Sequence, residues 1–220
     1  MNRQLIVTSD GSHTFFVPII NEQYHSIHGA VTESIHIFIN SGLLQCKKRE
    51  INVLEIGFGT GLNAYLTLLS VLDNGFKVNY YSVEKYPLTQ VEYEQLNYAA
   101  KIKSGNESFF IELHECKWGE NVKITPDFSL FKIHTDARNL ELEEYPFFDV
   151  IYFDAFAPDK HPDLWNEDIY NKIYNHSNPN AIFVTYCAKG VVRRSLQQVG
   201  FKVERIPGPP GKKEMIRAIK

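Results

Sequence analysis

Short apolar runs alternate with longer segments of helical periodicity along most of the chain. Ile51–Ile56 is an apolar run that leads through a glycine-rich turn into an apolar segment ending at about Leu72. A second apolar run ends at Glu84, and Pro87 and Thr89 then introduce a segment with helical spacing. These two strand, turn and helix units predict the beginning of an α/β domain.

The same alternation continues in the second half of the chain. Apolar runs predict strands that end near Asp136, Asp154 and Tyr186, and helical segments follow the last two. After them, the runs FKVERI and KKEMIRAI flank the turn PGPPG and predict a terminal hairpin. Together these elements predict a mostly parallel, seven-stranded sheet with helices on both faces and an antiparallel strand from the C-terminal hairpin.

Weaker patterns lie outside this core. The segment QLIVTSDGSHTFFV has apolar stretches on both sides of an Asp-Gly pair and predicts a small N-terminal β-hairpin. Residues 29–41 carry apolar side chains at helical spacing and stop at Gly42, a C-cap candidate. We therefore expect residues 1–45 to form a hairpin and helix packed on a core domain at residues 46–220. Residues 104–126 predict only loop around short extended pieces.

Composition and charge narrow the functional classes. The chain has 220 residues, enough for one well-buried core. Its formal net charge is −3, so the overall charge does not favour binding of a polyanion. Binding of nucleic acid would therefore depend on local clusters of basic residues. No signal-like segment and no run of about 18 apolar residues occurs, which predicts a cytoplasmic protein without a membrane span. Three scattered cysteines, Cys46, Cys116 and Cys187, are typical of reduced thiols.

Acidic residues stand at the carboxyl ends of four predicted strands, where open parallel sheets bind their ligands. Glu55 lies next to the end of the first predicted core strand. Glu84 ends the second strand, Asp136 the third and Asp154 the fourth. Glu84 is suited to accept hydrogen bonds from ribose hydroxyls. Asp136, with the backbone of Ala137, is suited to read an adenine. The alternative for each acid is an exposed strand-end charge or a helix N-cap.

The turn EIGFGTG places glycines at positions 57, 59 and 61. The dinucleotide fingerprint GxGxxG would need a further glycine at position 62, which is Leu62 here. Without Cβ atoms the turn can approach a ligand closely, as a loop that binds S-adenosylmethionine (SAM) requires. A glycine-rich turn without any ligand is the alternative.

Several longer stretches resemble one family. VLEIGFGTGLN, DAFAPDKHPDLW, TYCAKGVVRRSLQQVGF and GPPGKKEM, with YHSIHGAVTES ahead of the core, resemble the MnmC-like tRNA methyltransferase domain. The resemblance runs from about Tyr24 to the end. It implies a Rossmann-like class I SAM-dependent methyltransferase that methylates the 5-aminomethyl group of (2-thio)uridine at the tRNA wobble position, giving 5-methylaminomethyl-(2-thio)uridine. Because the chain stops at Lys220, it implies a stand-alone methyltransferase with SAM as cofactor and no flavin.

The resemblance also implies roles for individual residues. Asp154 would aim the lone pair of a neutral amine and stabilise the developing ammonium, and Tyr186 would stack on or hydrogen-bond the uracil. Phe156 and Pro158 would shape the pocket, with Tyr24 and Glu33 at its entrance. The residues expected to hold SAM are Glu55, Gly57, Gly59, Gly61, Asn63, Glu84, Asp136, Ala137 and Asp154. Those expected to hold phosphates around the tRNA anticodon loop are Lys189, Arg193, Arg194, Lys212 and Lys213.

Two other functions stay open at this stage. An aminopropyltransferase of the spermidine-synthase type uses the same fold with decarboxylated SAM, and its polyamine pocket would need carboxylates such as Asp159 and Asp163. A degenerate domain could instead bind SAM or RNA without catalysis. The HxxH pair of His25 and His28 has no third ligand nearby in sequence, so we expect structural histidines and no metal.

Overall fold

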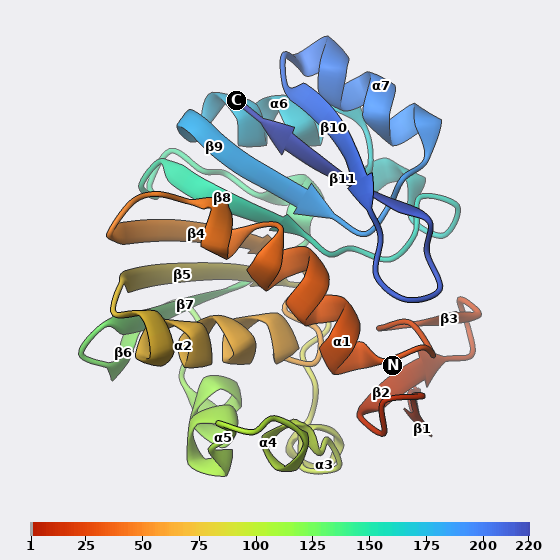
Figure 1. Ribbon diagram of the computed structural model, residues 1–220, viewed down its shortest axis with the longest axis vertical. Helices are drawn as coiled ribbons and strands as arrows, with labels where there is room; N and C mark the ends of the chain where they lie inside the picture. The colour runs from red at the N-terminus through yellow and green to blue at the C-terminus, as the bar shows by residue number, and fades with distance from the viewer. Residues whose placement is uncertain (1) are drawn as a thin grey trace.

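An eight-stranded mixed sheet organises the molecule (Figure 1). The computed structural model describes residues 2–220, and the strand order is β10-β11-β9-β8-β4-β5-β7-β6. The five central strands run parallel, and both edges carry antiparallel strands. The strands are β4 (Glu50–Ile56), β5 (Lys77–Glu84), β6 (Asn121–Thr125), β7 (Phe128–His134), β8 (Phe148–Phe153), β9 (Ser177–Thr185), β10 (Lys202–Pro207) and β11 (Glu214–Ile219).

Helices cover both faces of the sheet, because strand residues are apolar on both sides. Along β4, Val53 packs into one core and Leu54 into the other. The first face is covered by α1 (Ala30–Ser34), a π-helix (Ile35–Asn40), α2 (Leu62–Asn74) and α5 (Glu107–Glu115), and the second by α6 (Glu167–Asn175) and α7 (Gly190–Val199). The predicted α/β class is therefore confirmed.

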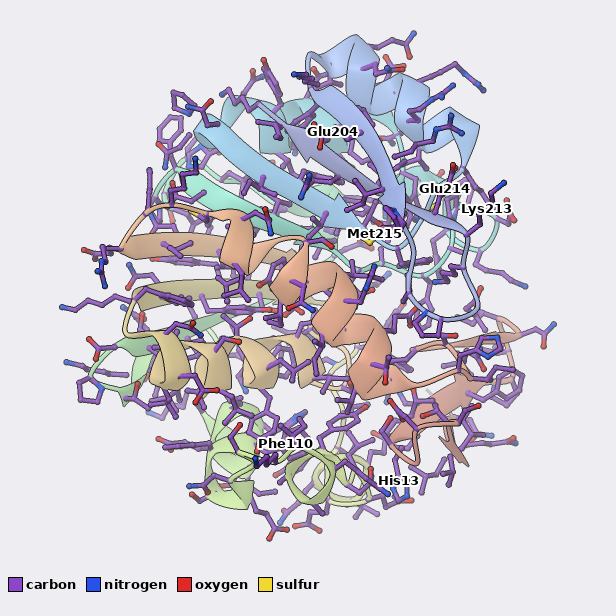
Figure 2. All side chains as sticks on the ribbon, viewed as in Figure 1. His13, Phe110, Glu204, Lys213, Glu214 and Met215 are labelled. Carbon is purple, nitrogen blue, oxygen red and sulfur yellow. The ribbon has the colours of Figure 1, made fainter. Side chains whose placement is uncertain are left out.

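Residues 104–126 were predicted as loop around short extended pieces, and that prediction missed a helix. They contain α5 and the edge strand β6, which makes the sheet eight-stranded rather than seven-stranded. The Asn106 side chain caps α5 by accepting a hydrogen bond from the Ser108 N–H at 3.0 Å. Phe110 on this short helix is buried and points into the core below α2 (Figure 2). A nine-residue helix with few buried positions leaves little periodicity to detect.

The N-terminal residues form a separate three-stranded antiparallel sheet of β1 (Gln4–Val7), β2 (His13–Val17) and β3 (Glu22–Gln23). The predicted hairpin is β1 and β2. Its turn holds the start of α1, because the Asp10 carboxylate accepts hydrogen bonds from the Thr32 N–H at 3.0 Å and from the Thr32 hydroxyl at 2.9 Å. This contact ties the N-terminal sheet to α1.

Two further local predictions need correction. The predicted helix over residues 29–41 begins as an α-helix and finishes as a π-helix, and Gly42 does not have the left-handed conformation of a C-cap. Gly42 is required for a different reason, since a Cβ there would lie 2.6 Å from the Phe38 carbonyl oxygen. The helical segment after Thr89 is divided into α3 (Gln90–Tyr93) and α4 (Tyr98–Lys101).

Candidate functional site

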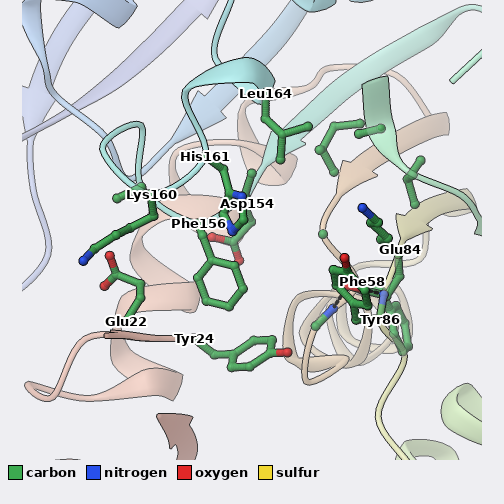
Figure 3. A pocket seen from close by; sticks show the side chains of 18 of the residues that line it. Glu22, Tyr24, Phe58, Glu84, Tyr86, Asp154, Phe156, Lys160, His161 and Leu164 are labelled. Carbon is green, nitrogen blue, oxygen red and sulfur yellow. Dashed lines mark hydrogen bonds between the residues drawn. The ribbon is translucent and has the colours of Figure 1, made fainter. Parts of the chain in front are cut away.

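A cavity of about 510 Å³ opens where β4, β5 and β8 end (Figure 3). Its walls come from segments far apart in sequence: residues 22–26 of the N-terminal sheet, the glycine turn after β4, the loops after β5 and β7, and the loop after β8. This is the edge at which a parallel sheet binds ligands. The cavity therefore lies at the sheet edge where the strand-end acids predict a ligand site.

The glycine turn is packed so closely that side chains would not fit. A Cβ on Gly57 would lie 2.7 Å from the Asp154 carbonyl oxygen, and one on Gly61 would lie 2.8 Å from His114 Nε2. Both glycines have positive φ angles, of 97° and 73°. The turn is thus held against its neighbours with its backbone toward the cavity.

His114 supports this turn from below and was missed by the sequence reading. Its Nε2 lies 3.1 Å from the Thr60 carbonyl oxygen, and its ring stacks on Tyr93 with centroids 4.5 Å apart. Burial lowers the pKa of His114 to about 3, so the ring is neutral at physiological pH and Nε2–H can donate to Thr60. His114 belongs to the unpredicted helix α5, so no local signal linked it to the turn.

Glu84 is held in place by two backbone amides. Its carboxylate oxygens accept hydrogen bonds from the Gly59 N–H at 2.9 Å and from the Tyr86 N–H at 2.6 Å. A carboxylate has about four acceptor positions, so further lone pairs remain available to a ligand. Figure 3 shows Glu84 on the cavity wall opposite Asp154. This geometry suits the predicted role toward ribose hydroxyls.

Asp136 lines the cavity, but its carboxylate is already occupied. It accepts hydrogen bonds from the Arg138 N–H and side chain and forms an ion pair with Lys85 at 2.9 Å. The Arg138 contact, with that of Lys85, holds the pKa of Asp136 well below its usual range. The predicted free carboxylate that reads an adenine amine is therefore not what the structure shows. Ala137 is buried at the cavity wall beside it.

Asp154 faces the cavity at the end of β8. The Asn63 side-chain N–H donates to its carboxylate at 2.8 Å. Burial raises the pKa of Asp154 to about 7, with a smaller contribution from the nearby Glu33 carboxylate, whereas the Asn63 hydrogen bond and the Lys212 charge act in the opposite direction. Asp154 can therefore gain or lose a proton near neutral pH. Such a carboxyl group is suited to proton transfer.

The loop after Asp154 forms a rigid aromatic wall. Phe156 makes an edge contact with Tyr24 of the N-terminal segment, with ring centroids 5.0 Å apart. The Trp165 indole N–H donates to the Phe156 carbonyl oxygen at 2.8 Å and so ties the two ends of the loop together. His161 also lines the cavity, whereas Pro158 is buried behind the wall. Phe156 therefore meets the predicted position, and Pro158 acts only through the shape of the loop.

Glu55 was predicted to touch the cofactor, and the structure places it below the cavity instead. Its side chain is completely buried, and the Ser82 hydroxyl donates to one carboxyl oxygen at 2.5 Å. Burial raises the pKa of Glu55 to about 8. As the penultimate residue of β4, Glu55 points into the sheet face rather than out of its end.

Tyr186 and Lys212 form the wall next to Asp154. The Tyr186 hydroxyl donates to the Ala155 carbonyl oxygen at 2.9 Å, so its proton is already used and its contact with a uracil stays a prediction for the ring or the hydroxyl oxygen. The Lys212 ammonium lies 4.2 Å from the Tyr186 ring centroid and donates to Glu33 at 2.8 Å. Lys212 therefore lines the cavity with its charge paired to Glu33, and its contact with a phosphate stays a prediction.

The other predicted basic residues do not gather at the cavity. Lys189 is paired with Asp159, and Arg193 and Arg194 lie on α7 outside the cavity lining. Lys213 projects from the outer side of the β10–β11 hairpin, next to the buried Met215 (Figure 2). Lys160 was not predicted as a contact, yet it stands at the cavity mouth.

Figure 3 shows Lys160 and Glu22 together on the side of the cavity away from Glu84. The mouth thus carries charges of both signs.

The candidate histidine pair does not suggest a metal site. His25 Nδ1 lies 2.9 Å from the Thr14 hydroxyl, and the His28 ring packs against Gly211. Within residues 2–220, no group of three or more His, Cys, Asp or Glu side chains could hold a metal ion. In the same residues no helix is both long and apolar enough to cross a membrane.

The sequence matches a known family model. A model described as S-adenosyl-L-methionine-dependent methyltransferase matches residues 107–220, just over half of the chain. The chain is 32% identical over 214 residues to a tRNA 5-methylaminomethyl-2-thiouridine biosynthesis bifunctional protein MnmC from Leptospira borgpetersenii, covering 88% of this chain and 31% of that protein. The MnmC protein of Burkholderia multivorans is 29% identical, with 92% and 33% covered. The chain thus spans about a third of the length of these relatives.

Solved structures show the same similarity. The crystal structure of MNMC2 from Aquifex aeolicus has a TM-score of 0.83 and 28% identity, with 99% of this chain and 69% of that chain covered. Spermidine synthase from Thermotoga maritima has a TM-score of 0.55 and 16% identity, covering 100% of this chain and 72% of that chain. At this identity the second likeness concerns the fold alone.

Proposed function

Since this chain belongs to the family of S-adenosyl-L-methionine-dependent methyltransferases, we propose that it methylates the amine of a 5-aminomethyl-(2-thio)uridine at the wobble position of tRNA. The product would be 5-methylaminomethyl-(2-thio)uridine. The observation that carries the proposal is the place of the Asp154 carboxyl group, which directly follows β8, lines the cavity and is held by the Asn63 side chain. The similarity to MnmC proteins and to MNMC2 supports this choice of substrate.

The cavity fits SAM in the groups it offers. Glu84 keeps acceptor positions for ribose hydroxyls, and the backbone at Gly57 and Gly59 permits close approach of a ligand. Ile56, Val83 and Leu164 add an apolar lining suited to a base. When bound, SAM supplies a sulfonium methyl group that is transferred to a nucleophile.

Asp154 acts on the acceptor amine. A neutral amine becomes positively charged as its bond to carbon forms, so a carboxylate that accepts its N–H both aims the lone pair and stabilises the growing charge. With a pKa near 7, Asp154 can then remove the extra proton. Phe156 and Tyr24 offer aromatic surfaces on which a uracil splayed out of a single-stranded loop can stack.

The tRNA backbone needs contacts outside this cavity. We assign them to Arg193 and Arg194 on α7, to Lys213 on the outer face of the β10–β11 hairpin and to Lys160 at the mouth. Charge reversal of Arg193 and Arg194 should weaken tRNA binding. It should also reduce the slope of the logarithm of the binding constant against the logarithm of the salt concentration, by roughly one for each phosphate contact that is lost. Filter binding of tRNA over a salt series measures this, and unchanged slopes would remove α7 from the interface.

The same proposal extends to the division of the chain into two parts and to the cellular compartment of the protein. Residues 1–45 would be an extension that closes the cavity over a methyltransferase domain at residues 46–220, since Tyr24 and Glu33 both line the cavity. A tRNA substrate favours a cytoplasmic protein. Neither a flavin nor a metal enters the reaction that we propose.

Methyl transfer from labelled SAM to tRNA tests the function. The acceptor is tRNA from cells that lack this final methylation, and mass spectrometry of its nucleosides should show 5-methylaminomethyl-(2-thio)uridine only when the protein is present. Parallel reactions contain putrescine with decarboxylated SAM, the substrates of an aminopropyltransferase. Aminopropyl transfer to putrescine, or SAM binding without any methylated nucleoside, would contradict the proposal and revive the corresponding alternative.

A further inference from the structure

Buried polar atoms without partners gather beneath Asp154. Glu55 Oε1, Asn63 Oδ1 and the Tyr80 hydroxyl are all buried and lack a hydrogen-bond partner within residues 2–220. Burial raises the pKa of Glu55, and the Asn63 and Tyr80 side chains lie close enough to its carboxyl group to lower that pKa by a smaller amount. Since unpaired buried polar groups are costly, this cluster needs an explanation.

A count of donors and acceptors identifies what the cluster lacks. Asn63 Oδ1 can only accept, and an ionised Glu55 can only accept as well. The donors nearby are the Tyr80 hydroxyl and the second N–H of Asn63, because the Ser82 hydroxyl already donates to the other oxygen of Glu55 and the first Asn63 N–H donates to Asp154. A proton on Glu55 adds a donor that can serve Asn63 Oδ1, which has no partner within residues 2–220.

Charge leads to the same protonation state. Glu55 is completely buried and the charge of Asp154 lies close to it, so two carboxylates would repel each other at this point. The other titratable groups that face Glu55 are Tyr80 and Tyr152, and neither is a cation. Around Asp154, Lys212 is the nearby cation, and it is paired with Glu33.

We propose that Glu55 is a positioning residue that keeps its proton in the working enzyme and, through Asn63, holds Asp154 as the single negative charge at the reacting amine. Asn63 connects the two acids because its N–H donates to Asp154 at 2.8 Å. The inference rests on the proposed function for the identity of the amine, but not for the protonation of Glu55. Burial raises the pKa of Glu55 to about 8 and that of Asp154 to about 7, which agrees with the loss of one proton from the pair near neutral pH.

The protonation state can be read without any activity assay. Protein labelled with ¹³C at the glutamate side-chain carboxyls is titrated by NMR, and the Glu55 signal is the one missing from Glu55→Gln. We expect that signal to show a protonated carboxyl at pH 7 and to titrate near pH 8, whereas exposed glutamates titrate near 4.3. A Glu55 signal that is ionised at pH 7 would overturn the proposal, whatever the protein methylates.

Activity then tests the positioning role. Glu55→Gln keeps a neutral group that can donate and accept, so it should retain methyl transfer within about threefold and lose the decline in rate that ionisation of Glu55 causes in the wild type above about pH 8. Glu55→Ala removes the donor and should lose tenfold or more in kcat with little change in the KM for SAM. If folded Glu55→Gln loses as much kcat as Glu55→Ala, or keeps the alkaline decline, Glu55 does not act as we propose.

Discussion

Replacing Asp154 by asparagine removes the charge on which the proposed reaction depends and leaves the shape of the side chain. Two unit charges about 3 Å apart interact by roughly 5 kcal/mol at an effective dielectric constant of about 20. With about half of the ammonium charge developed in the transition state, the loss is roughly 2–3 kcal/mol, or on the order of 100-fold in kcat. We therefore expect Asp154→Asn to lose about 100-fold in kcat while its affinity for SAM stays within a few-fold of wild type.

The assay is single-turnover and steady-state transfer of labelled methyl to tRNA at saturating SAM, with calorimetry for SAM affinity. Asp73→Asn is a matched control, because Asp73 is exposed near the C-terminal end of α2, away from the cavity lining, and loses the same charge. A kcat within threefold of wild type with normal SAM binding would refute the role of Asp154. A loss confined to SAM affinity would make Asp154 a cofactor contact only.

The pH profile gives an independent test of the same residue. With a pKa near 7, Asp154 is mostly protonated at pH 6 and mostly ionised at pH 8. The ionised form is the active one, so kcat should rise about fivefold over this interval in the wild type, since the ionised fraction of Asp154 rises about tenfold while about half of Glu55 loses its proton by pH 8. The Asp154→Asn variant should show no such rise, and an equal rise in both proteins would assign it to another group.

Three further changes probe the surrounding residues. Glu84→Gln should weaken SAM binding by roughly tenfold or more, and calorimetry measures the loss. The reason is that one carboxylate oxygen, which now accepts hydrogen bonds, would be replaced by an amide N–H that points at other donors. Lys212→Met leaves Glu33 unpaired and removes a charge that lowers the pKa of Asp154, so the midpoint of the kcat rise should move to higher pH, and an unmoved midpoint would contradict this. For Glu55, whose folded pKa of about 8 exceeds the ordinary value of 4.5, the wild type should lose unfolding free energy as pH rises from about 4.5 to 8, by roughly 5 kcal/mol in all, whereas Glu55→Gln should not. Urea denaturation of both proteins at pH 5 and pH 8 measures the change in unfolding free energy between the two pH values. An equal change in the two proteins would disprove the prediction.

Much of the lining of the candidate site could be predicted because its signals are local. Glu84 and Asp154 each follow an apolar run, and parallel strands bring their carboxyl ends to one edge of the sheet. The glycine turn was recognisable from its spacing, and the aromatic loop after Asp154 from its composition. The errors also have local causes. The helix α5 is short, and it carries His114, so its contact with the glycine turn could not be anticipated.

The alternation of strands and helices over most of the chain, the α/β class and the sheet edge that carries the candidate site follow from the chain's own pattern, because hydrophobic periodicity and turn residues act over a few positions. Which charges remain free at that edge is decided only by the folded molecule. Lys212 and Glu33 are 179 residues apart and meet in the cavity wall, and Lys85 reaches Asp136 from a neighbouring strand end. Glu55 lies at a strand end like Glu84, yet its position just inside the sheet buries it completely. Pairing and burial depend on contacts between distant segments, and these contacts decide which of the predicted acids faces a ligand and which keeps its proton.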